Sequence, residues 1–340
     1  MPSSVVIQTS FLGDTILTTP LLAQLAHRGP VDVVTTPAAA SVLTGHPAVR
    51  SVIVYDKRGA DAGVGGFRRL AARLRAEDYA VAYLAQGSVR SAMLAVLAGY
   101  PGRVGFETSR AARPLYTRIV PYRADRHHAE RLWSLAMPDD APPARDALRP
   151  RLYPGREEKR AVDELLTGFG AGEVLVAVAP GSVWATKRWP YYPELAARLA
   201  ETAHVVVVGG PGDRELAGAV VDACPPGRAL DATGRLSLLA SAELIGRAGL
   251  LVTNDSAPQH LASAMGTPTL TIFGPTVPDF GVGPLAPGSR LAGHEGLACR
   301  PCHAHGPQRC PLGHWRCMRE QTPEAMAELA SRMLASAPVR

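Results

Sequence analysis

An aspartate just past the first apolar segment of the chain has a type and a position that suit catalysis. Residues 5–7 read as a short buried strand, Gln8 to Asp14 form the turn that follows, and a helix is predicted from Ile16 to Leu25. Asp14 then stands near a helix N-terminus, above the carboxyl edge of a sheet, where α/β proteins keep their chemistry. Its carboxylate has two interpretations: a general base that faces a cleft, or an acid that complements the helix dipole.

A second polar turn interrupts the apolar stretch 250–273. The run 250–253 has strand length, Asp255 and Ser256 suit a helix N-cap, and 269–273 reads as the next parallel strand. In such a βαβ unit, the backbone N–H groups of the turn and the helix dipole favour an anion such as phosphate. The alternative is that Asp255 and Ser256 only cap the helix.

Another loop combines glycine, hydroxyl groups and cations after a buried strand. The strand is predicted at 174–178, and residues 180–190 then supply Ser182, Thr186 and Lys187. Backbone donors, hydroxyls and a point charge together suit a phosphate group. The other interpretation is a polar loop whose cations are exposed to solvent.

Two further turns lie in the second half of the chain, which then has four polar turns after predicted strands. Residues 205–208 read as a strand that ends in a turn containing Gly210, after which Asp213 or Glu215 suits a ribose hydroxyl. Residues 231–237 form the last of the turns and precede a helix. Because all four turns are expected at the carboxyl ends of strands in one parallel sheet, they predict a nucleotide-sized pocket.

The composition describes a globular protein with a basic balance. Of the 340 residues, 46% are hydrophobic and 19% are charged, and no apolar run approaches the roughly 20 residues of a membrane span. The N-terminus lacks the pattern of a signal peptide, so we expect a cytoplasmic location. The net charge of +6 suits an anionic substrate or membrane face, although a GC-rich genome also favours arginine. Because no basic stripe contains interleaved aromatic residues, we expect no nucleic-acid partner.

Strands and helices alternate along the chain, which predicts an α/β fold with doubly wound parallel sheets. The turn at Gln8 lacks G-x-G-x-x-G, so a dinucleotide cofactor is not expected. A proline-rich stretch at 138–154 indicates an exposed linker that contains the domain boundary. The predicted domains are residues 1–150 and 151–322, and a terminal helix follows at 323–340.

The segment 299–317 contains the most metal-like cluster of the sequence. Its four cysteines are Cys299, Cys302, Cys310 and Cys317. A structural zinc and reduced thiols are both open interpretations, and disulfides are less natural in a reducing cytoplasm. His127, His128 and Glu130 are interpreted as a surface or inter-domain polar cluster, because neighbouring helix positions point in different directions.

Five motifs in the right order give the chain a resemblance to a known family. They are LGDTILTTPLL at 12–22, QGSVRSAML at 86–94, APGSVWATKRWP at 179–190, GGPGDRE at 209–215 and NDSAPQHLASAMGTP at 254–268. Together they resemble glycosyltransferase family 9, the lipopolysaccharide heptosyltransferases, and most closely the heptosyltransferase II group. The likeness extends over nearly the whole chain. It implies a GT-B fold, in which two Rossmann-like domains face each other across a cleft.

The resemblance also implies an activity, the inverting and metal-independent transfer of heptose from ADP-heptose to the lipopolysaccharide inner core. By that likeness Asp14 is the general base and Lys187 stabilises the leaving diphosphate, with no cofactor required. We expect the Asp255 side chain to order its loop or reach a sugar hydroxyl, because a carboxylate repels phosphate. The residues expected to bind the donor are Gly13, Ser182, Thr186, Lys187, Gly210, Glu215, Thr233, Gly234, Leu236, Asp255, Ser256 and His260.

The acceptor in the resembled family is anionic and anchored to lipid A, which implies peripheral contact with the cytoplasmic face of the inner membrane. The first domain is expected to bind this acceptor, and the terminal helix is expected to cross back to that domain. We expect a monomer. Two alternatives stand beside this interpretation: a GT-B sugar-nucleotide enzyme with another donor or acceptor, and a non-catalytic nucleotide-binding protein.

Overall fold

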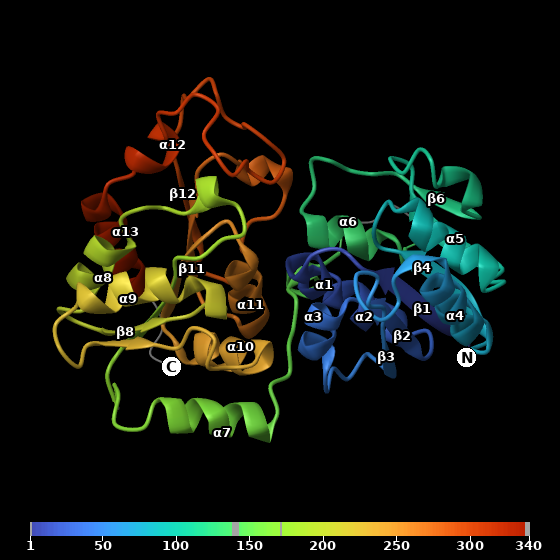
Figure 1. Cartoon of the computed structure of the whole chain (residues 1–340), viewed down its shortest axis with the longest axis horizontal. Coiled ribbons are helices and arrows are strands. Elements are labelled where there is room, and N and C mark those ends of the chain that lie inside the picture. Colours follow the sequence, from blue (N-terminus) through green and yellow to red (C-terminus); the bar gives the residue numbers. More distant parts are fainter. Residues whose placement is uncertain (1, 138–142, 171, 337–340) are drawn as a thin grey trace. The chain divides into compact units, whose positions relative to one another are not determined.

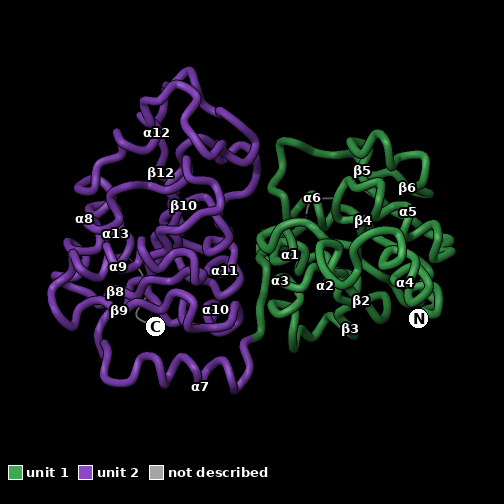
Figure 2. Tube along the Cα trace, viewed as in Figure 1, with its two compact units in different colours: residues 1–153 green, residues 154–340 purple. Residues whose placement is uncertain are grey.

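The computed structural model divides the chain into two compact units (Figure 1). It describes residues 2–137, 143–170 and 172–336. The first unit spans residues 1–153 and the second spans residues 154–340 (Figure 2). The boundary therefore falls within the proline-rich stretch, just past the expected position after residue 150. Residues 138–142 of that stretch lie outside the described part.

A parallel sheet forms the centre of the first unit, in the strand order β3-β2-β1-β4-β5-β6. Its strands are β1 (Ser3–Gln8), β2 (Val31–Thr35), β3 (Ser51–Val54), β4 (Tyr79–Leu84), β5 (Gly102–Phe106) and β6 (Arg118–Val120). Its helices are α1 (Leu12–Leu17), α2 (Thr19–Ala26), α3 (Pro37–Ala40), α4 (Gly63–Arg75), α5 (Val89–Leu97) and α6 (His128–Ser134), with short 3₁₀ turns η1 (Ser41–Leu43), η2 (Arg113–Leu115) and η3 (Arg145–Leu148). The order reverses between β1 and β4, so the turns after these two strands flank the crevice where such sheets bind ligands.

The second unit repeats this architecture, in the strand order β12-β11-β10-β7-β8-β9. Its strands are β7 (Leu175–Ala179), β8 (His204–Val207), β9 (Ala229–Asp231), β10 (Leu250–Asn254), β11 (Thr269–Phe273) and β12 (Arg290–Gly293). Its helices are α7 (Arg156–Leu165), α8 (Tyr192–Leu199), α9 (Arg214–Asp222), α10 (Leu238–Arg247), α11 (Ala257–Met265), α12 (Arg316–Arg319) and α13 (Pro323–Ser336), with 3₁₀ turns η4 (Ala185–Lys187), η5 (Pro211–Asp213) and η6 (Pro278–Phe280). The two parallel sheets confirm the predicted doubly wound α/β class. Here the order reverses between β7 and β10.

The central strands are buried on both faces, which explains why they read as continuous apolar runs. In β1, the side chains of Val5, Val6 and Ile7 are all inaccessible to solvent. Successive side chains point to opposite faces of a sheet. Val5 and Ile7 pack into one core with residues of α4 and α5, and Val6 therefore faces the other helical layer.

The single helix predicted from Ile16 to Leu25 is two helices in the structure. The first, α1, begins at Leu12 and ends at Leu17, and α2 begins at Thr19 with a proline in its first turn. Proline has no N–H group to continue the hydrogen bonds of the preceding helix, so the break occurs there. Asp14 consequently lies in the first turn of α1.

The terminal helix α13 packs on elements of the second unit, and its expected crossing to the first domain stays a prediction. Helix α13 packs against α8 and β10 of its own unit. Its buried side chains Met326, Ala330 and Met333 join the core formed by strands of that sheet. An apolar stripe on the helix covers one face of this sheet, which accounts for the position. Residues 337–340 lie outside the described part.

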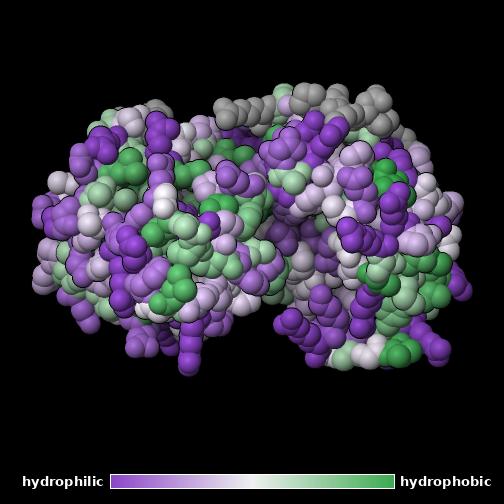
Figure 3. All heavy atoms as spheres, turned by 90° about the horizontal axis from the view of Figure 1, so that it is seen from above, coloured by the Kyte–Doolittle hydropathy of each residue, from purple (hydrophilic) through white to green (hydrophobic). Residues whose placement is uncertain are grey.

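Among the described residues, no helix combines the length and the apolar character that a membrane crossing demands. On the face seen in Figure 3, hydrophilic side chains are interspersed with small hydrophobic patches.

A buried histidine makes the stability of the first unit depend on pH. His46 is 5% exposed, its Nδ1 accepts a hydrogen bond from the Ala48 amide at 3.2 Å, and its ring lies edge-on to Tyr153. Burial lowers the pKa of His46 from 6.5 to about 4. The unfolded chain therefore binds a proton at His46 more readily than the folded chain does. The free energy of unfolding is highest above the unfolded pKa of His46 and decreases as the pH falls towards its folded pKa.

We expect the free energy of unfolding of the first unit to be about 2 kcal/mol lower near pH 5 than near pH 8. Urea unfolding at both pH values, followed through hydrogen exchange of amides in the first unit, measures this difference. His46→Asn keeps an acceptor for the Ala48 amide and cannot titrate, so this variant should lose most of the difference. An unchanged pH dependence in the variant would show that another group is responsible.

Candidate functional site

The Asp14 carboxylate lies at the switch point of the first sheet, where it contacts a hydroxyl and an imidazole. The Ser10 hydroxyl donates a hydrogen bond to Asp14 Oδ2 at 2.6 Å, and His128 Nε2 lies 3.5 Å from Asp14 Oδ1. The Asp14 side chain is 29% exposed. A carboxylate that is partly open to solvent and held by neighbours on both oxygens can accept a proton from a bound hydroxyl group.

His128, which the sequence analysis interpreted as part of a surface or inter-domain polar cluster, lies beside Asp14 in the structure. It opens helix α6, which packs against α1 and α2, and no local pattern indicates that contact. Burial lowers the pKa of His128, the Asp14 charge opposes this shift, and the Arg131 charge reinforces it. The imidazole is therefore neutral at pH 7 and can exchange a proton with its surroundings.

Cations and amides gather around the same turn. Lys57 Nζ donates to the Thr9 carbonyl at 2.7 Å, and Gln86 Nε2 donates to the Thr9 hydroxyl at 2.5 Å. Burial lowers the pKa of Lys57, and the charges of Arg58 and Arg90 lower it further. The turns after β1, β3 and β4 therefore share a positively charged environment, which suits an anionic ligand.

In the second unit, Lys187 and Asp255 form a buried ion pair at the switch point. Lys187 Nζ lies 2.6 Å from Asp255 Oδ2 and also donates to the Asp255 carbonyl at 3.1 Å. The two residues are 8% and 5% exposed. Gln259 and Thr276 also donate to the Asp255 carboxylate, at 2.9 and 2.8 Å. Asp255 therefore orders its loop, and the side chain of Lys187 is directed towards the N-terminus of α11.

Asn254 joins the two turns of this switch point, a contact that the sequence analysis did not predict. Its Oδ1 accepts hydrogen bonds from the Trp189 amide at 3.0 Å and the Tyr192 hydroxyl at 3.1 Å. Its Nδ2 donates to the Pro180 carbonyl at 2.9 Å. The residue is fully buried. The turn after β10 and the turn after β7 are thus fixed to each other by one side chain.

Ser256 and His260 lie in and next to α11. Ser256 occupies the N-cap position, and its side chain makes no capping hydrogen bond. The alternative that Asp255 and Ser256 only cap the helix therefore has no support in the side-chain contacts. His260 is buried in the first half of α11. Gly13, in the first unit, is buried in α1.

The turns after β8 and β9 meet at the same edge of the sheet. The Gly234 amide donates to the Gly209 carbonyl at 3.0 Å, and the Gly210 amide donates to Asp213 Oδ2 at 2.9 Å. A Cβ on Gly181 would lie 2.3 Å from the Asp213 carboxylate, so Asp213 packs between neighbouring turns. Asp213 is thus engaged in the turn, whereas Glu215 is exposed in the first turn of α9.

Thr233 and Leu236 border this edge from the turn after β9. The Thr233 hydroxyl donates to Asp231 Oδ1 at 2.6 Å, and its side chain is buried. Leu236 is half-buried beside it. Gly234 has φ +66°, and a Cβ there would come within 2.9 Å of Pro211. Glycine is required for this close approach between the two turns.

The cysteine-rich segment holds the Ser182–Lys187 loop. Thr186 donates through its hydroxyl to the Pro307 carbonyl, and the Gln308 side chain accepts from the Ala185 amide and donates to the Val183 carbonyl, both at 3.0 Å. Ser182 Oγ accepts from the Trp184 amide at 3.3 Å. Thr186 is thus buried and engaged in positioning the loop, and Ser182 is partly exposed.

The four cysteines of 299–317 are free thiols. Cys299 Sγ lies 3.9 Å from His314 Nε2, and Cys302 Sγ donates to the Cys299 carbonyl at 3.0 Å. Within the described ranges, no three His, Cys, Asp or Glu side chains are arranged to hold a metal ion. A structural zinc needs four convergent ligands, so this arrangement does not support the zinc interpretation.

Comparison with known proteins identifies similar sequences and folds. The model of "Glycosyltransferase family 9 (heptosyltransferase)" matches residues 67–312. Lipopolysaccharide heptosyltransferase 1 of Pseudomonas aeruginosa is 32% identical over 293 residues, which cover 81% of this chain and 79% of that protein. A glycosyl transferase of family 9 from Veillonella parvula superimposes with a TM-score of 0.85 at 22% identity, covering 99% and 98% of the two chains. The ADP-heptose lipopolysaccharide heptosyltransferase II of Escherichia coli gives 0.79 at 24% identity, covering 98% and 99%.

Proposed function

Because this chain belongs to glycosyltransferase family 9, the heptosyltransferases, we propose that it transfers heptose from ADP-heptose to the inner core of lipopolysaccharide. The GT-B fold of its relatives is present in the two doubly wound units. The observation that carries the proposal is the placement of a carboxylate, Asp14, at one switch point and of a cation, Lys187, beside a helix N-terminus at the other.

The proposed reaction is a single displacement at the anomeric carbon. Asp14 takes the proton of the acceptor hydroxyl as its oxygen forms the new C–O bond, and the bond to the diphosphate breaks with its electron pair leaving on ADP. Attack opposite the leaving group inverts the anomeric centre. The charge that develops on the diphosphate is stabilised by Lys187 and by the dipole of α11. In metal-dependent glycosyltransferases a metal ion supplies positive charge to the diphosphate. Here Lys187 and the helix dipole are proposed to supply it, so the proposed reaction requires no cofactor.

The donor is proposed to bind along the carboxyl edge of the second sheet. The glycine turn at Gly210 and the turn at Thr233–Leu236 are in contact there, and they suit the adenosine. Glu215 is proposed to face the ribose. Ser182 and Ser256 follow β7 and β10, the two strands at the switch point, and suit the diphosphate.

The acceptor is proposed to bind the first unit. Its inner core and lipid A are anionic, and the turns near Asp14 carry Lys57, Arg58 and Arg90, whose charges interact. The net charge of +6 also favours a peripheral position at the cytoplasmic face of the inner membrane. Relatives named heptosyltransferase 1 and heptosyltransferase II both match the chain, so the accepting sugar is the property to determine first.

Incubation of the protein with ADP-heptose and heptose-deficient lipopolysaccharide core tests the proposal. Mass spectrometry of the core should show the addition of one heptose. A parallel reaction on core that already carries the first heptose distinguishes the two acceptor classes. Release of ADP without transfer to either core, or donor binding with no turnover, would replace this proposal by one of the alternatives.

We expect His128→Gln to lower kcat by about tenfold, less than the loss expected for the base itself. The pKa of His128 is lowered by burial, so its protonation on acidification adds a positive charge beside Asp14 and weakens the base. The wild-type kcat should therefore fall more steeply below neutral pH than that of the variant. Profiles of kcat against pH measure this, with His27→Gln, a change at an exposed residue, as the control. If the profiles of wild type and His128→Gln ran parallel, protonation of His128 would have no effect on Asp14 as the base.

A further inference from the structure

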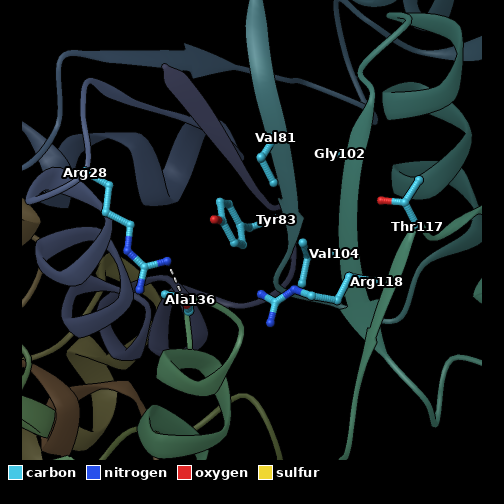
Figure 4. Close-up of a pocket in the computed structure, with 8 residues that line it drawn as sticks. All are labelled: Arg28, Val81, Tyr83, Gly102, Val104, Thr117, Arg118 and Ala136. Atoms are coloured by element: carbon cyan, nitrogen blue, oxygen red, sulfur yellow. Dashed lines mark hydrogen bonds between the residues drawn. The ribbon is translucent and has the colours of Figure 1, made fainter. Parts of the chain in front are cut away.

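A cavity of about 430 Å³ lies in the first unit beside strands β4 and β5 (Figure 4). It is lined by Arg28, Val81, Tyr83, Gly102, Val104, Thr117, Arg118 and Ala136. The volume is within the roughly 300–1,000 Å³ range of small-molecule sites. None of the residues proposed for heptose transfer contributes to this lining.

The floor of the cavity is a section of the sheet face that points away from α4 and α5. Ala82 and Leu84 of β4 point into the core with α4 and α5, so Val81 and Tyr83, which alternate with them, face the other side. Val104 is the register partner of Tyr83 on β5. The two valines and the aromatic ring give this floor an apolar surface.

Two arginines stand over this floor from different elements, on either side of Tyr83 (Figure 4). Arg28 follows α2 and donates to the Ala136 carbonyl at 2.5 Å. Arg118 begins β6 and donates to the carbonyls of Met137, at 2.7 Å, and Leu135. Each guanidinium is thereby aimed by neutral carbonyl groups at the end of α6.

The charges of these arginines are not neutralised by the residues that the structure describes. Among those residues, no carboxylate lies within ion-pair distance of Arg28 or Arg118. Burial lowers the pKa of Arg118, and the charge of Arg28 lowers it further, against an opposing contribution of Tyr83. Arg28 is exposed and Arg118 is half-buried. Two cations that repel each other gain free energy when an anion enters between them.

We propose that this cavity binds a phosphate ester that carries an apolar chain. Arg28 and Arg118 hold the phosphate from two sides, since planar guanidinium groups match phosphate oxygens. The chain lies along Val81, Val104 and the ring of Tyr83, which removes apolar surface from water. The site is separate from the proposed heptose transfer, so it stands whether or not that proposal holds.

Calorimetric titration of the full-length protein with octyl phosphate tests this site. Inorganic phosphate and octyl glucoside serve as probes that lack the chain or the charge. Octyl phosphate should bind at least about tenfold more tightly than either probe, because it alone satisfies both halves of the cavity. Arg28→Gln, at an exposed position, should weaken binding by about tenfold. Arg73→Gln, a change at an exposed arginine of α4, should alter it by less than about twofold.

Other results would overturn the proposal. If octyl glucoside bound as tightly as octyl phosphate, the phosphate group would not contribute to binding. If inorganic phosphate bound as tightly as octyl phosphate, the apolar chain would not contribute. An equal loss in Arg28→Gln and Arg73→Gln would indicate non-specific attraction to a basic surface. Methyl NMR signals of Val81 and Val104 should shift with octyl phosphate in the wild type, and unshifted signals would place the ligand elsewhere.

The source of the phosphate ester is distinguished by a vesicle assay. Sedimentation with phosphatidylcholine vesicles that contain phosphatidic acid, compared with phosphatidylcholine alone, measures recruitment to lipid phosphate. Recruitment that depends on Arg28 supports the site with a membrane lipid as its ligand. Octyl phosphate binding without such recruitment supports the site with a water-soluble ester as its ligand.

Discussion

Asp14→Asn lowers kcat for heptose transfer by about three orders of magnitude, within the range that general-base catalysis contributes. The amide has nearly the same shape as the carboxylate and accepts no proton at neutral pH. Because Asp14 lies in the first unit and the proposed donor site lies in the second, the dissociation constant for ADP-heptose should remain within about twofold of the wild-type value. Rapid-quench measurement of transfer and calorimetry with the donor check the two halves of this expectation.

A matched variant separates loss of the base from disturbance of the turn. Ser10→Ala removes the hydroxyl that donates to Asp14 and leaves the carboxylate in place. This variant should retain most of the activity, with a loss of about tenfold or less. If Asp14→Asn were as active as Ser10→Ala, another group would be the base, and the neutral imidazole of His128 would be the first to examine.

The second large effect is expected at Lys187. Lys187→Met leaves the Asp255 carboxylate buried with only the hydrogen bonds from Gln259 and Thr276. Removal of one partner from a buried pair typically costs about 3–5 kcal/mol, because the remaining charge is uncompensated. The same change removes a cation from beside the proposed diphosphate site, which should lower kcat by about 10²-fold or more. Urea unfolding and single-turnover transfer measure the two effects.

The double variant Lys187→Met with Asp255→Asn separates stability from catalysis. With both charges gone, no uncompensated carboxylate remains, so most of the lost free energy of unfolding should return. The activity should not return, since the cation is still absent. Recovery of transfer in the double variant would show that Lys187 serves only to neutralise Asp255, and would move the stabilisation of the leaving group to the N-terminus of α11.

Much of the fold was predictable because its determinants are local. The buried runs of β1 and β10 are apolar over strand length and end in polar turns, so the alternation of strands and helices follows from neighbouring residues alone. The positions of Asp14, Lys187 and Asp255 after strands placed them at a carboxyl edge by the same reasoning. Even so, the break between α1 and α2 and the two-unit boundary at Tyr153 differ slightly from the expected positions.

The partners of these residues depend on which strands become neighbours, and strand order is not a local property. His128 reaches Asp14 because α6 packs on α1. Asn254 joins two turns because β10 lies beside β7. Helix α13 covers its own sheet because its apolar stripe packs into the core of that sheet.

The sequence by itself therefore determined the class of fold and the family resemblance, and it predicted the type of chemistry at each turn. Only the tertiary structure decided that Lys187 pairs with Asp255, that the cysteine-rich segment holds the loop before it, and that two distant arginines meet over one cavity. Periodicity and turn chemistry act between residues close in sequence. Ion pairs and cavities arise between residues far apart in sequence, and the order and register of the sheet bring them together.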